Sequence, residues 1–507
     1  MSDYDAIIIG AGHNGLTCAA YLAQAGKRVV VIEARDSVGG LASHQHSLGA
    51  GNFAVADRLP AIPRKIVKDL ALVRQGFCEA DSPLSTFAIR ADGALIQFAG
   101  GEATGVSEKD ATAYREFHRR MKRYAGVLNP LWLQPPPRLV GPDLAAAKFF
   151  GGLGLRLRLL GADEMGEFLR VLALPMSDLL DEWFEDPQFK AMLCWQGLVG
   201  NKLAPHSPNH AVLNFLQRFI TEDIDGMAVV GDGQHLIEAL ERATRAAGAE
   251  ILTGAKVLQV DLGPGPDGLQ ATGVTLASGQ RIAAGIVVSA AHPKNTFLDL
   301  VGQENLGIEF ANRIRRIRSN GMVAKAHFMI SAPLEIAGAP LADQHFLIAP
   351  SMDAIESAFD DVKYGGFPTD PMLEITAPRC PDQCHMISAT VMYVPAQPKL
   401  AWDADAKERL LQTVVSKIAR YSPNFQETVT SSELLTPQDI AETYGICGGH
   451  WHHGELALDQ MMMMRPTYEA AQYRTPIAGL FLCSAGCHPG GGIAGAPGHN
   501  AAQEILK

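Results

Sequence analysis

Short apolar runs separated by polar and glycine-rich segments recur at both ends and in the middle of the chain. At the N-terminus, residues 6–9 are all apolar, as expected for a strand buried in a parallel sheet, and residues 28–32 form a second run. In the middle, residues 234–247 carry apolar side chains at helical spacing, and 286–291 predicts another buried strand. Residues 479–486 form a last strand-like run before a glycine-dense loop and a final helix. This pattern predicts an α/β fold.

Three glycines, Gly10, Gly12 and Gly15, follow the first predicted strand with G-x-G-x-x-G spacing. The first permits a tight turn, the second lets the backbone approach a pyrophosphate, and the third lets helix and strand pack closely. The second predicted strand ends in Glu33, roughly 20 residues further on, where an acid can bind a ribose 2′-hydroxyl. The pattern therefore predicts an adenine-dinucleotide site, and the acid argues against NADP.

The motif by itself fits NAD and FAD equally well, because both carry adenosine diphosphate. A glycine pair, Gly39 and Gly40, follows Glu33 and indicates either a second close approach of backbone to ligand or an ordinary turn. The pair resembles the extended FAD-binding sequence of the glutathione-reductase-like FAD proteins. This resemblance favours FAD.

Composition and charge narrow the classes of protein further. The chain has 507 residues, 47% of them hydrophobic and 19% charged, which is enough for at least two domains with a large core. The net charge of −11 argues against a nucleic-acid partner. The sequence shows neither a basic secretory leader nor an apolar run of about 18 residues. We therefore expect a cytoplasmic protein.

The apolar strands and glycine motifs fall into separate segments. We predict a discontinuous Rossmann-like FAD-binding domain, glutathione-reductase-like, formed by residues 1–75, 225–295 and 451–507. Residues 76–224, mostly helical in pattern, and 296–450, a mixture of strands and helices, would form an inserted α+β substrate domain.

Five segments carry a family resemblance. They are the N-terminal glycine motif with Glu33, residues 231–236, 287–291 and 453–459, and 465–476 continuing into the loop at 488–492. Together they resemble the phytoene-desaturase-like FAD oxidoreductases of the amine-oxidase superfamily. More closely, they are similar to the subgroup of pyridine nucleotide-disulphide oxidoreductase domain-containing proteins. Many relatives in the wider superfamily have an acid where Cys487 follows Gly486, a departure that the desaturase-like branch shares.

The resemblance implies non-covalent FAD, with the adenine near Val257 and the flavin under the C-terminal loop. The predicted cofactor site contains the following residues: Gly10, Gly12, His13, Asn14, Gly15, Glu33, Ala34, Arg35, Gly39, Gly40, Leu41, Val257, Ala290, Gly486, Gly492 and Ile493.

The resemblance also implies an oxidoreductase that transfers hydride between an apolar substrate, polyene- or isoprenoid-like, and flavin N5 by desaturation, saturation or isomerisation. Two alternatives stay open: an amine-oxidase-like enzyme, with Trp451, Tyr468 and Tyr473 as an aromatic cage, and a non-catalytic prenyl-binding escort protein. The chain has no second dinucleotide motif, so oxygen, a quinone or a bound substrate would reoxidise the flavin.

Three side chains are candidates for catalysis. His488 lies in the loop expected near the flavin, and His453 lies in a segment shared with the family. Lys325 lies on a predicted strand, where amine-oxidase relatives often place a lysine near flavin N5, although a solvated strand lysine is the simpler interpretation. For both histidines the alternative is a structural role in the loop.

Two further features have weaker functional interpretations. His450, His452, His453 and Cys447 fit no zinc-ligand spacing, so we predict no metal site. Two cysteine pairs with three residues between their members, Cys380/Cys384 and Cys483/Cys487, are expected to pack rather than to form redox disulfides. Residues 149–160, apolar and basic, predict a helix that touches a membrane surface, a lid, or an ordinary packed helix.

Overall fold

The computed structural model describes residues 4–44, 46–57, 61–80, 85–138, 141, 144–208, 211–223, 226–230, 233–266, 268–341, 344–378, 385–492 and 494–507. Ile493, one of the predicted cofactor residues, lies outside these ranges, as do Cys380, Cys384 and the start of the family segment at 231–236.

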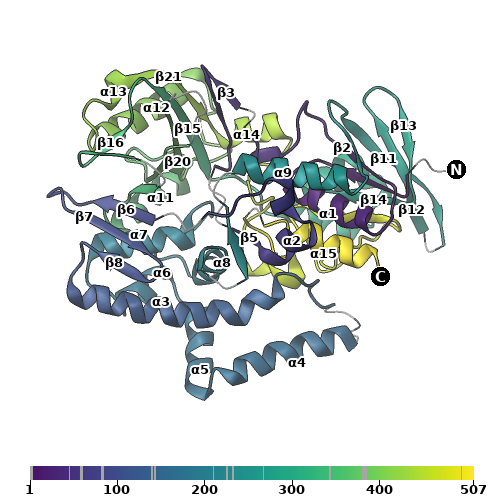
Figure 1. Cartoon of the computed structure of the whole chain (residues 1–507), viewed down its shortest axis with the longest axis horizontal. Helices are drawn as coiled ribbons and strands as arrows, with labels where there is room; N and C mark the ends of the chain where they lie inside the picture. The colour runs from purple at the N-terminus through teal and green to yellow at the C-terminus, as the bar shows by residue number, and fades with distance from the viewer. Residues whose placement is uncertain are drawn as a thin grey trace.

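A parallel sheet of five strands forms one half of the molecule (Figure 1). Its order is β10 (Glu250–Leu252), β2 (Val29–Ile32), β1 (Ala6–Ile9), β14 (Ile286–Ser289) and β22 (Leu480–Leu482), and all neighbouring pairs are parallel. Every residue of β1, β2 and β22 is buried, which explains their continuous apolar sequences. The predicted Rossmann-like α/β fold is therefore confirmed.

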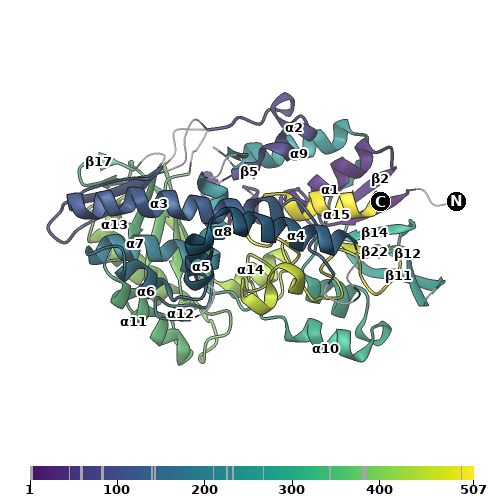
Figure 2. The ribbon, with the colours of Figure 1, turned by 90° about the horizontal axis from the view of Figure 1, so that it is seen from below.

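Helices and a small antiparallel sheet complete this half. Helix α1 (His13–Gln24) packs against α9 (Gly233–Ala246) and α15 (Ala496–Ile505), so the two ends of the chain lie side by side (Figures 1 and 2). The small sheet has three strands, β11 (Val257–Gly265), β12 (Gly268–Leu276) and β13 (Arg281–Ala283). Strands and helices from the beginning, the middle and the end of the sequence thus surround the turn that follows β1.

The other half is built on a mixed sheet of eight strands. In order these are β21 (Val429–Leu435), β15 (Val323–Ile330), β20 (His385–Met392), β19 (Leu373–Thr376), β18 (Gln344–Ile348), β6 (Ser85–Ile89), β7 (Leu95–Ala99) and β8 (Glu102–Thr104). The neighbouring helices include α3 (Glu108–Leu128), α6 (Met176–Asp181), α7 (Pro187–Leu198), α8 (Ala211–Asp223), α11 (Met352–Lys363) and α12 (Ala404–Ala419), as Figures 1 and 2 show.

The sequence pattern of residues 76–224 indicated mostly helices, yet β6, β7 and β8 lie within that segment. These strands were missed because β7 and β8 are short and partly exposed, and β6 joins the sheet by pairing in parallel with β18, more than 250 residues away. The domain boundaries drawn from the sequence stay a prediction.

Two helices stand apart from both sheets. Helix α4 (Leu144–Leu159) and helix α5 (Ala162–Val171) lie below α3 at the lower edge of the molecule in Figure 1. Among the described residues, no helix combines the length and the apolar character that crossing a membrane would require. This finding leaves the expected cellular location a prediction.

Candidate functional site

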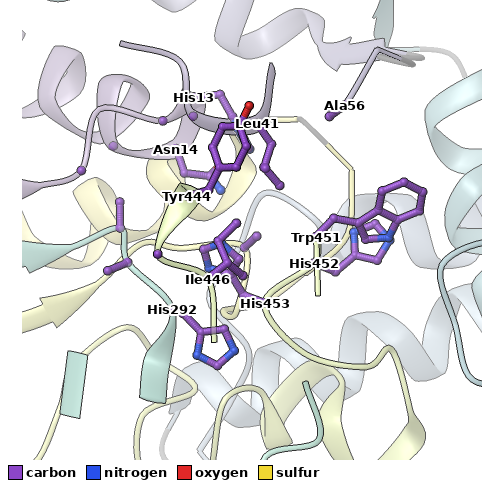
Figure 3. A pocket seen from close by; sticks show the side chains of 18 of the residues that line it. His13, Asn14, Leu41, Ala56, His292, Tyr444, Ile446, Trp451, His452 and His453 are labelled. Carbon is purple, nitrogen blue, oxygen red and sulfur yellow. The ribbon is translucent and has the colours of Figure 1, made fainter. Parts of the chain in front are cut away.

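A cavity of about 720 Å³ joins the two halves of the molecule. Residues from the N-terminal glycine turn line it together with residues from α7, α8, β19 and β20. Figure 3 shows His13, Asn14 and Leu41 of the N-terminal segment facing the same space as Tyr444, Trp451 and His453, which come from the last quarter of the chain. The cavity therefore connects the predicted dinucleotide site to the second sheet.

The three motif glycines are needed for three different physical reasons. Gly10 has φ +94°, a left-handed conformation that side chains rarely adopt. A Cβ on Gly15 would lie 2.0 Å from the carbonyl oxygen of Gly10, so this position has no room for a side chain. A Cβ on Gly12 would meet no atom of the described chain within 4 Å, because this glycine faces the open cavity. Gly12 thus leaves space for a ligand rather than for the protein.

Glu33 is already oriented by the protein. One carboxylate oxygen accepts a hydrogen bond of 2.8 Å from the backbone N–H of Ala11, and the other accepts one of 3.0 Å from the N–H of Arg35. The side chain is 9% exposed and lines the cavity, so its remaining lone pairs face the ligand space. This geometry suits a ribose hydroxyl.

The predicted cofactor residues fall into two groups, those that line the cavity and those that do not. Those that line the cavity are Gly10, Gly12, His13, Asn14, Gly15, Glu33, Ala34, Arg35, Gly39, Gly40, Leu41, Val257, Ala290 and Gly492. Gly486 does not line it: a Cβ there would lie 2.5 Å from the side chain of Pro293, so close packing requires this glycine. Its neighbour Ala485 lines the cavity instead.

Histidines and a tryptophan form the middle of the cavity wall, as Figure 3 shows. His292, His452 and His453 line it, and the ring centroids of His292 and His453 are 5.4 Å apart. Burial lowers the pKa of His453 to about 3 and holds the pKa of the other two well below 6.5. All three rings are therefore neutral at neutral pH. His453 lines the cavity, and its catalytic role stays a prediction.

His488 lies behind the wall rather than on it. Its Nε2–H donates to the carbonyl of Leu131 at 2.9 Å, and its own carbonyl accepts a hydrogen bond from the hydroxyl of Tyr473 at 2.7 Å. Burial lowers its pKa to about 4. The structure thus gives His488 a role in holding the C-terminal loop, and the catalytic role stays a prediction.

The aromatic cage of Trp451, Tyr468 and Tyr473 does not assemble, because only Trp451 lines the cavity. Tyr473 is fully buried, and the hydroxyl of Tyr468 accepts a hydrogen bond from Arg313.

Arg465 organises this wall, a role that the sequence did not reveal. Its guanidinium is buried and donates to the carbonyls of His452, Gly454, Glu455, Gln460 and Ala485, at distances from 2.6 to 3.3 Å. Burial lowers its pKa to about 10, so it stays charged. One side chain therefore ties the histidine segment to the end of the last strand. The only hint in the sequence was that Arg465 lies in a segment shared with the family.

The simpler interpretation of Lys325 as a solvated strand lysine is wrong. Its side chain is 1% exposed, and its ammonium lies 2.8 Å from Asp57 and 3.0 Å from the hydroxyl of Thr390. Burial, the largest single influence, would raise the pKa of Asp57, but the charge and the hydrogen bond of Lys325, together with smaller contributions from neighbouring groups, outweigh it and lower the pKa. Asp57 and Thr390 both line the cavity, so Lys325 acts on the ligand space through them.

The far wall of the cavity is rich in polar side chains that sequence reasoning missed. The lining residues there are Gln196, Asn201, Asn214, Gln217, Arg218, Thr221, Glu374 and Thr390. They were missed because they come from α7 and the loop after it, from α8 and from two strands, which no local motif connects. The spacing of Asn214, Gln217, Arg218 and Thr221 along one face of α8 was the only available sign. No cluster of three or more metal-ligating side chains occurs within the described ranges.

The site fits a dinucleotide, and sequence comparison identifies which one. A model of flavin-containing amine oxidoreductases matches residues 101–506, and a model of NAD(P)-binding Rossmann-like domains matches residues 8–63. The chain belongs to the flavin-containing amine oxidoreductase family. It is an oxidoreductase whose cofactor is FAD.

Relatives in this family align over the whole chain. The chain is 32% identical to pyridine nucleotide-disulfide oxidoreductase domain-containing protein 2 of Rattus norvegicus, over 100% of this chain and 94% of that protein. It is 25% identical to a lycopene-forming phytoene desaturase of a Paracoccus species, covering 97% and 95%. The resemblance to desaturase-like FAD oxidoreductases is therefore confirmed.

The fold of this family member also matches solved structures. A putrescine oxidase bound to putrescine superposes with a TM-score of 0.59 at 16% identity, covering 99% of this chain and 98% of that one. At this level of identity the likeness concerns the fold alone. From the spacing of the glycine motif and the position of both residues in the cavity, we predict that Gly12 faces the FAD pyrophosphate and that Glu33 binds a ribose hydroxyl.

Proposed function

We propose that this protein is an FAD-dependent dehydrogenase that transfers hydride between a carbon of an isoprenoid-like substrate and flavin N5. The single observation that carries the proposal is the continuity of the cavity, which runs from Gly12 and Glu33 to the wall formed by α8 and β19. Cofactor and substrate can therefore share one enclosed space. The phytoene desaturase among its relatives supports a desaturation-type reaction with hydride transfer.

FAD, when bound, supplies the hydride acceptor, so the protein needs no nucleophile of its own. The chain's residues would do the remaining work. Trp132 and Trp451 line the cavity and would shield the reacting carbon from water. His292 and His453 line the cavity as neutral rings, and Nε2 of His292 and Nδ1 of His453 have no hydrogen-bond partner among the described residues, so these two side chains would orient the substrate. Their lowered pKa disfavours holding a proton, so the proton that leaves with the hydride would pass to solvent.

Amine oxidation is the second candidate. The solved structures with this fold include a putrescine oxidase, which supports the fold and leaves the substrate open. A specific observation also favours it: Gln196, Asn201 and Gln217 line the cavity, and their side-chain oxygens have no hydrogen-bond partner among the described residues. An amine donates hydrogen bonds to such acceptors. The two candidates differ in the bond oxidised and can be separated with substrate pairs.

The test uses purified protein and flavin absorbance. We expect oxidised flavin to be bound and to bleach under anaerobic conditions when an isoprenoid substrate is added. The variant Gly12→Val should fold but lose the flavin, because its side chain would enter the space left for the pyrophosphate.

The matched control is Gly126→Val, on the exposed surface of α3, where an added Cβ meets no described atom within 4 Å. It should keep the flavin. A wild-type protein that neither contains flavin nor takes it up would refute the proposal. Bleaching by primary amines with no bleaching by isoprenoids would favour amine oxidation instead.

A further inference from the structure

The far wall of the cavity contains buried polar atoms that are not used by the protein. Within the described part of the chain, the side-chain oxygens of Gln196, Asn201 and Gln217 have no hydrogen-bond partner, and neither polar atom of Asn214 has one. These four residues are between 3% and 8% exposed, and all four line the cavity. Leaving such groups unpaired in the interior is costly, so a ligand that pairs with them gains affinity.

The chemical character of these atoms is specific. The Gln217 amide nitrogen donates to the carbonyls of Pro489 and Gly490, at 3.2 and 2.5 Å, which orients its oxygen as the free acceptor. The Asn201 nitrogen likewise donates to the carbonyl of Val199 at 3.4 Å. The oxygens of Gln217 and Asn201 are therefore free acceptors, and a ligand that pairs with them must donate hydrogen bonds. Arg218, the cation on this wall, lies 3.8 Å from the carboxylate of Glu374.

Charged groups beside the amides reinforce this preference. Glu374 lines the cavity between the indole N–H of Trp195, which donates at 2.8 Å, and the ring of His345 at 2.7 Å. Thr390 lies directly opposite Glu374 on β20, so both side chains share one face of the sheet. Acceptor oxygens thus continue from α8 onto the sheet.

From this arrangement we propose that the far wall binds a hydrogen-bond-donating group of the substrate, a hydroxyl or an amine. Asn214, Gln196 and Asn201 would determine specificity for that group. The inference deepens the proposed function, on which it rests, because it replaces a wholly apolar substrate by one with a polar end. The apolar part would lie beside Val199 and Leu456, which also line the cavity.

The experiment compares four probes of similar size: geraniol, geranylamine, geranyl methyl ether and myrcene. Binding is measured by the shift in unfolding temperature and by perturbation of the flavin spectrum. We expect the alcohol and the amine to bind at least about tenfold more tightly than the ether and the hydrocarbon, because only the first two donate hydrogen bonds.

The variant Asn214→Leu provides a readout that a merely structural asparagine would not give. It should lower the affinity for the alcohol and the amine about tenfold, and it should raise the unfolding temperature of the ligand-free protein because it removes two buried polar atoms with no partner among the described residues. Gln412→Leu, an amide deletion on the exposed face of α12, is the control and should leave probe binding unchanged.

The outcomes separate this inference from the proposed function. If myrcene and the ether bind as tightly as the two donors, or if no donor binds, the inference about the wall is overturned even when isoprenoids bleach the flavin. If the donors bind and Asn214→Leu weakens them, but no probe exchanges electrons with the flavin, the inference stands and the proposed hydride transfer is refuted.

A separate observation concerns helix α4, whose outer face is apolar. Leu144, Leu155 and Leu159 are 72%, 60% and 75% exposed, and Phe150 on the same helix is 44% exposed. Solvent-facing helix positions in soluble proteins are usually polar, so a row of exposed leucines marks an interaction surface.

The charge of α4 favours one kind of partner. The helix contains Lys148, Arg156 and Arg158 but no acidic residue, whereas the whole chain carries a net charge of −11. Apolar side chains flanked by cations suit the interface of an anionic lipid bilayer. We infer that α4 attaches the protein to an anionic membrane surface.

Vesicle co-sedimentation tests this second inference. The protein should bind vesicles that contain phosphatidylglycerol at least tenfold better than vesicles of phosphatidylcholine alone. The double variant Leu155→Gln/Leu159→Gln should lose this binding, while the control Leu400→Gln, at another exposed leucine, should keep it. Equal binding of the double variant, or self-association through α4 in light scattering without vesicle binding, would overturn the inference.

Discussion

The two ends of the cavity differ in the groups that form them: backbone groups at one end and side chains at the other. At the N-terminal end, backbone groups define the site: glycines at 10, 12 and 15 make space, and N–H groups of Ala11 and Arg35 hold Glu33. At the far end, side chains from α7, α8, β19 and β20 define it. A backbone-built site needs particular residues at fixed spacing. A side-chain-built site needs only that distant elements meet.

This difference explains how substrate specificity can change while the cofactor stays the same. Amide side chains on a helix face can be exchanged without altering the fold, but a glycine that faces another backbone cannot. The first end should therefore tolerate almost no substitution, and the second should tolerate many with altered binding.

The largest expected effect is at Gly15. In Gly15→Val the new Cβ would lie 2.0 Å from the carbonyl oxygen of Gly10, so β1 and α1 could no longer pack, and we expect a loss of about 4 kcal/mol or more in the free energy of unfolding. Soluble yield and chemical denaturation measure it. Gly12→Val in flavin-free protein is the contrast and should cost less than about 1 kcal/mol. Equal destabilisation by the two would contradict the distinction between fold and ligand space.

The next largest effect should come from Arg465, which ties the histidine segment between the two ends to the end of the last strand. Arg465→Met would leave five buried backbone carbonyls without their donor, at a cost of about 3–5 kcal/mol, and would release the flavin. Thermal unfolding and flavin content are the measurements. A variant with wild-type unfolding temperature and flavin content would show that the histidine wall does not depend on the hydrogen bonds of Arg465.

The buried histidines should make stability depend on pH. The pKa values of His13 and His488 are lowered to about 4 and that of His453 to about 3, all by burial. Between pH 6.5 and about 4.5 the unfolded chain therefore binds protons that the native protein does not. As the pH is lowered through this window, the free energy of unfolding should decrease by about 1.4 kcal/mol per pH unit for each such histidine.

His488→Gln sharpens the pH experiment. Glutamine keeps an N–H donor for the carbonyl of Leu131 but cannot titrate, so the slope should decrease by the contribution of one histidine. An unchanged slope would mean that His488 is protonated in the native protein. If the variant also turns over substrate at the wild-type rate, the predicted catalytic role of His488 is excluded.

The smallest effect on stability should come from exchanging both members of the buried pair Lys325 and Asp57, which connects the N-terminal segment to β15. Lys325→Met alone leaves Asp57 buried without its main cation and should cost about 3 kcal/mol. The double variant Lys325→Met/Asp57→Leu should lie within about 1 kcal/mol of wild type while changing the rate of flavin reduction. Additive costs of the two substitutions would show that the pair is not a unit.

The features of the site that could be predicted from the sequence lie at the backbone-built end, and those that could not be predicted depend on side chains from distant elements. The glycine turn, Glu33 and the buried strands could be identified because each depends on neighbours within roughly 35 residues. The burial of Lys325 could not, since it depends on Asp57, which lies 268 positions away, and on the pairing of β15 with β20. The roles of Asn214 and Arg465 were hidden for the same reason: single polar residues carry no local pattern.

One contact has a consequence for biosynthesis. Helix α15 lies so close to α1 that a Cβ on Gly498 would be 2.2 Å from the carbonyl oxygen of Asn14. The nucleotide cradle at the start of the chain thus lacks one of its supporting helices until residues 496–505 have left the ribosome. FAD should therefore be captured only after α15 has been translated, and a nascent protein stalled before α15 should carry no flavin.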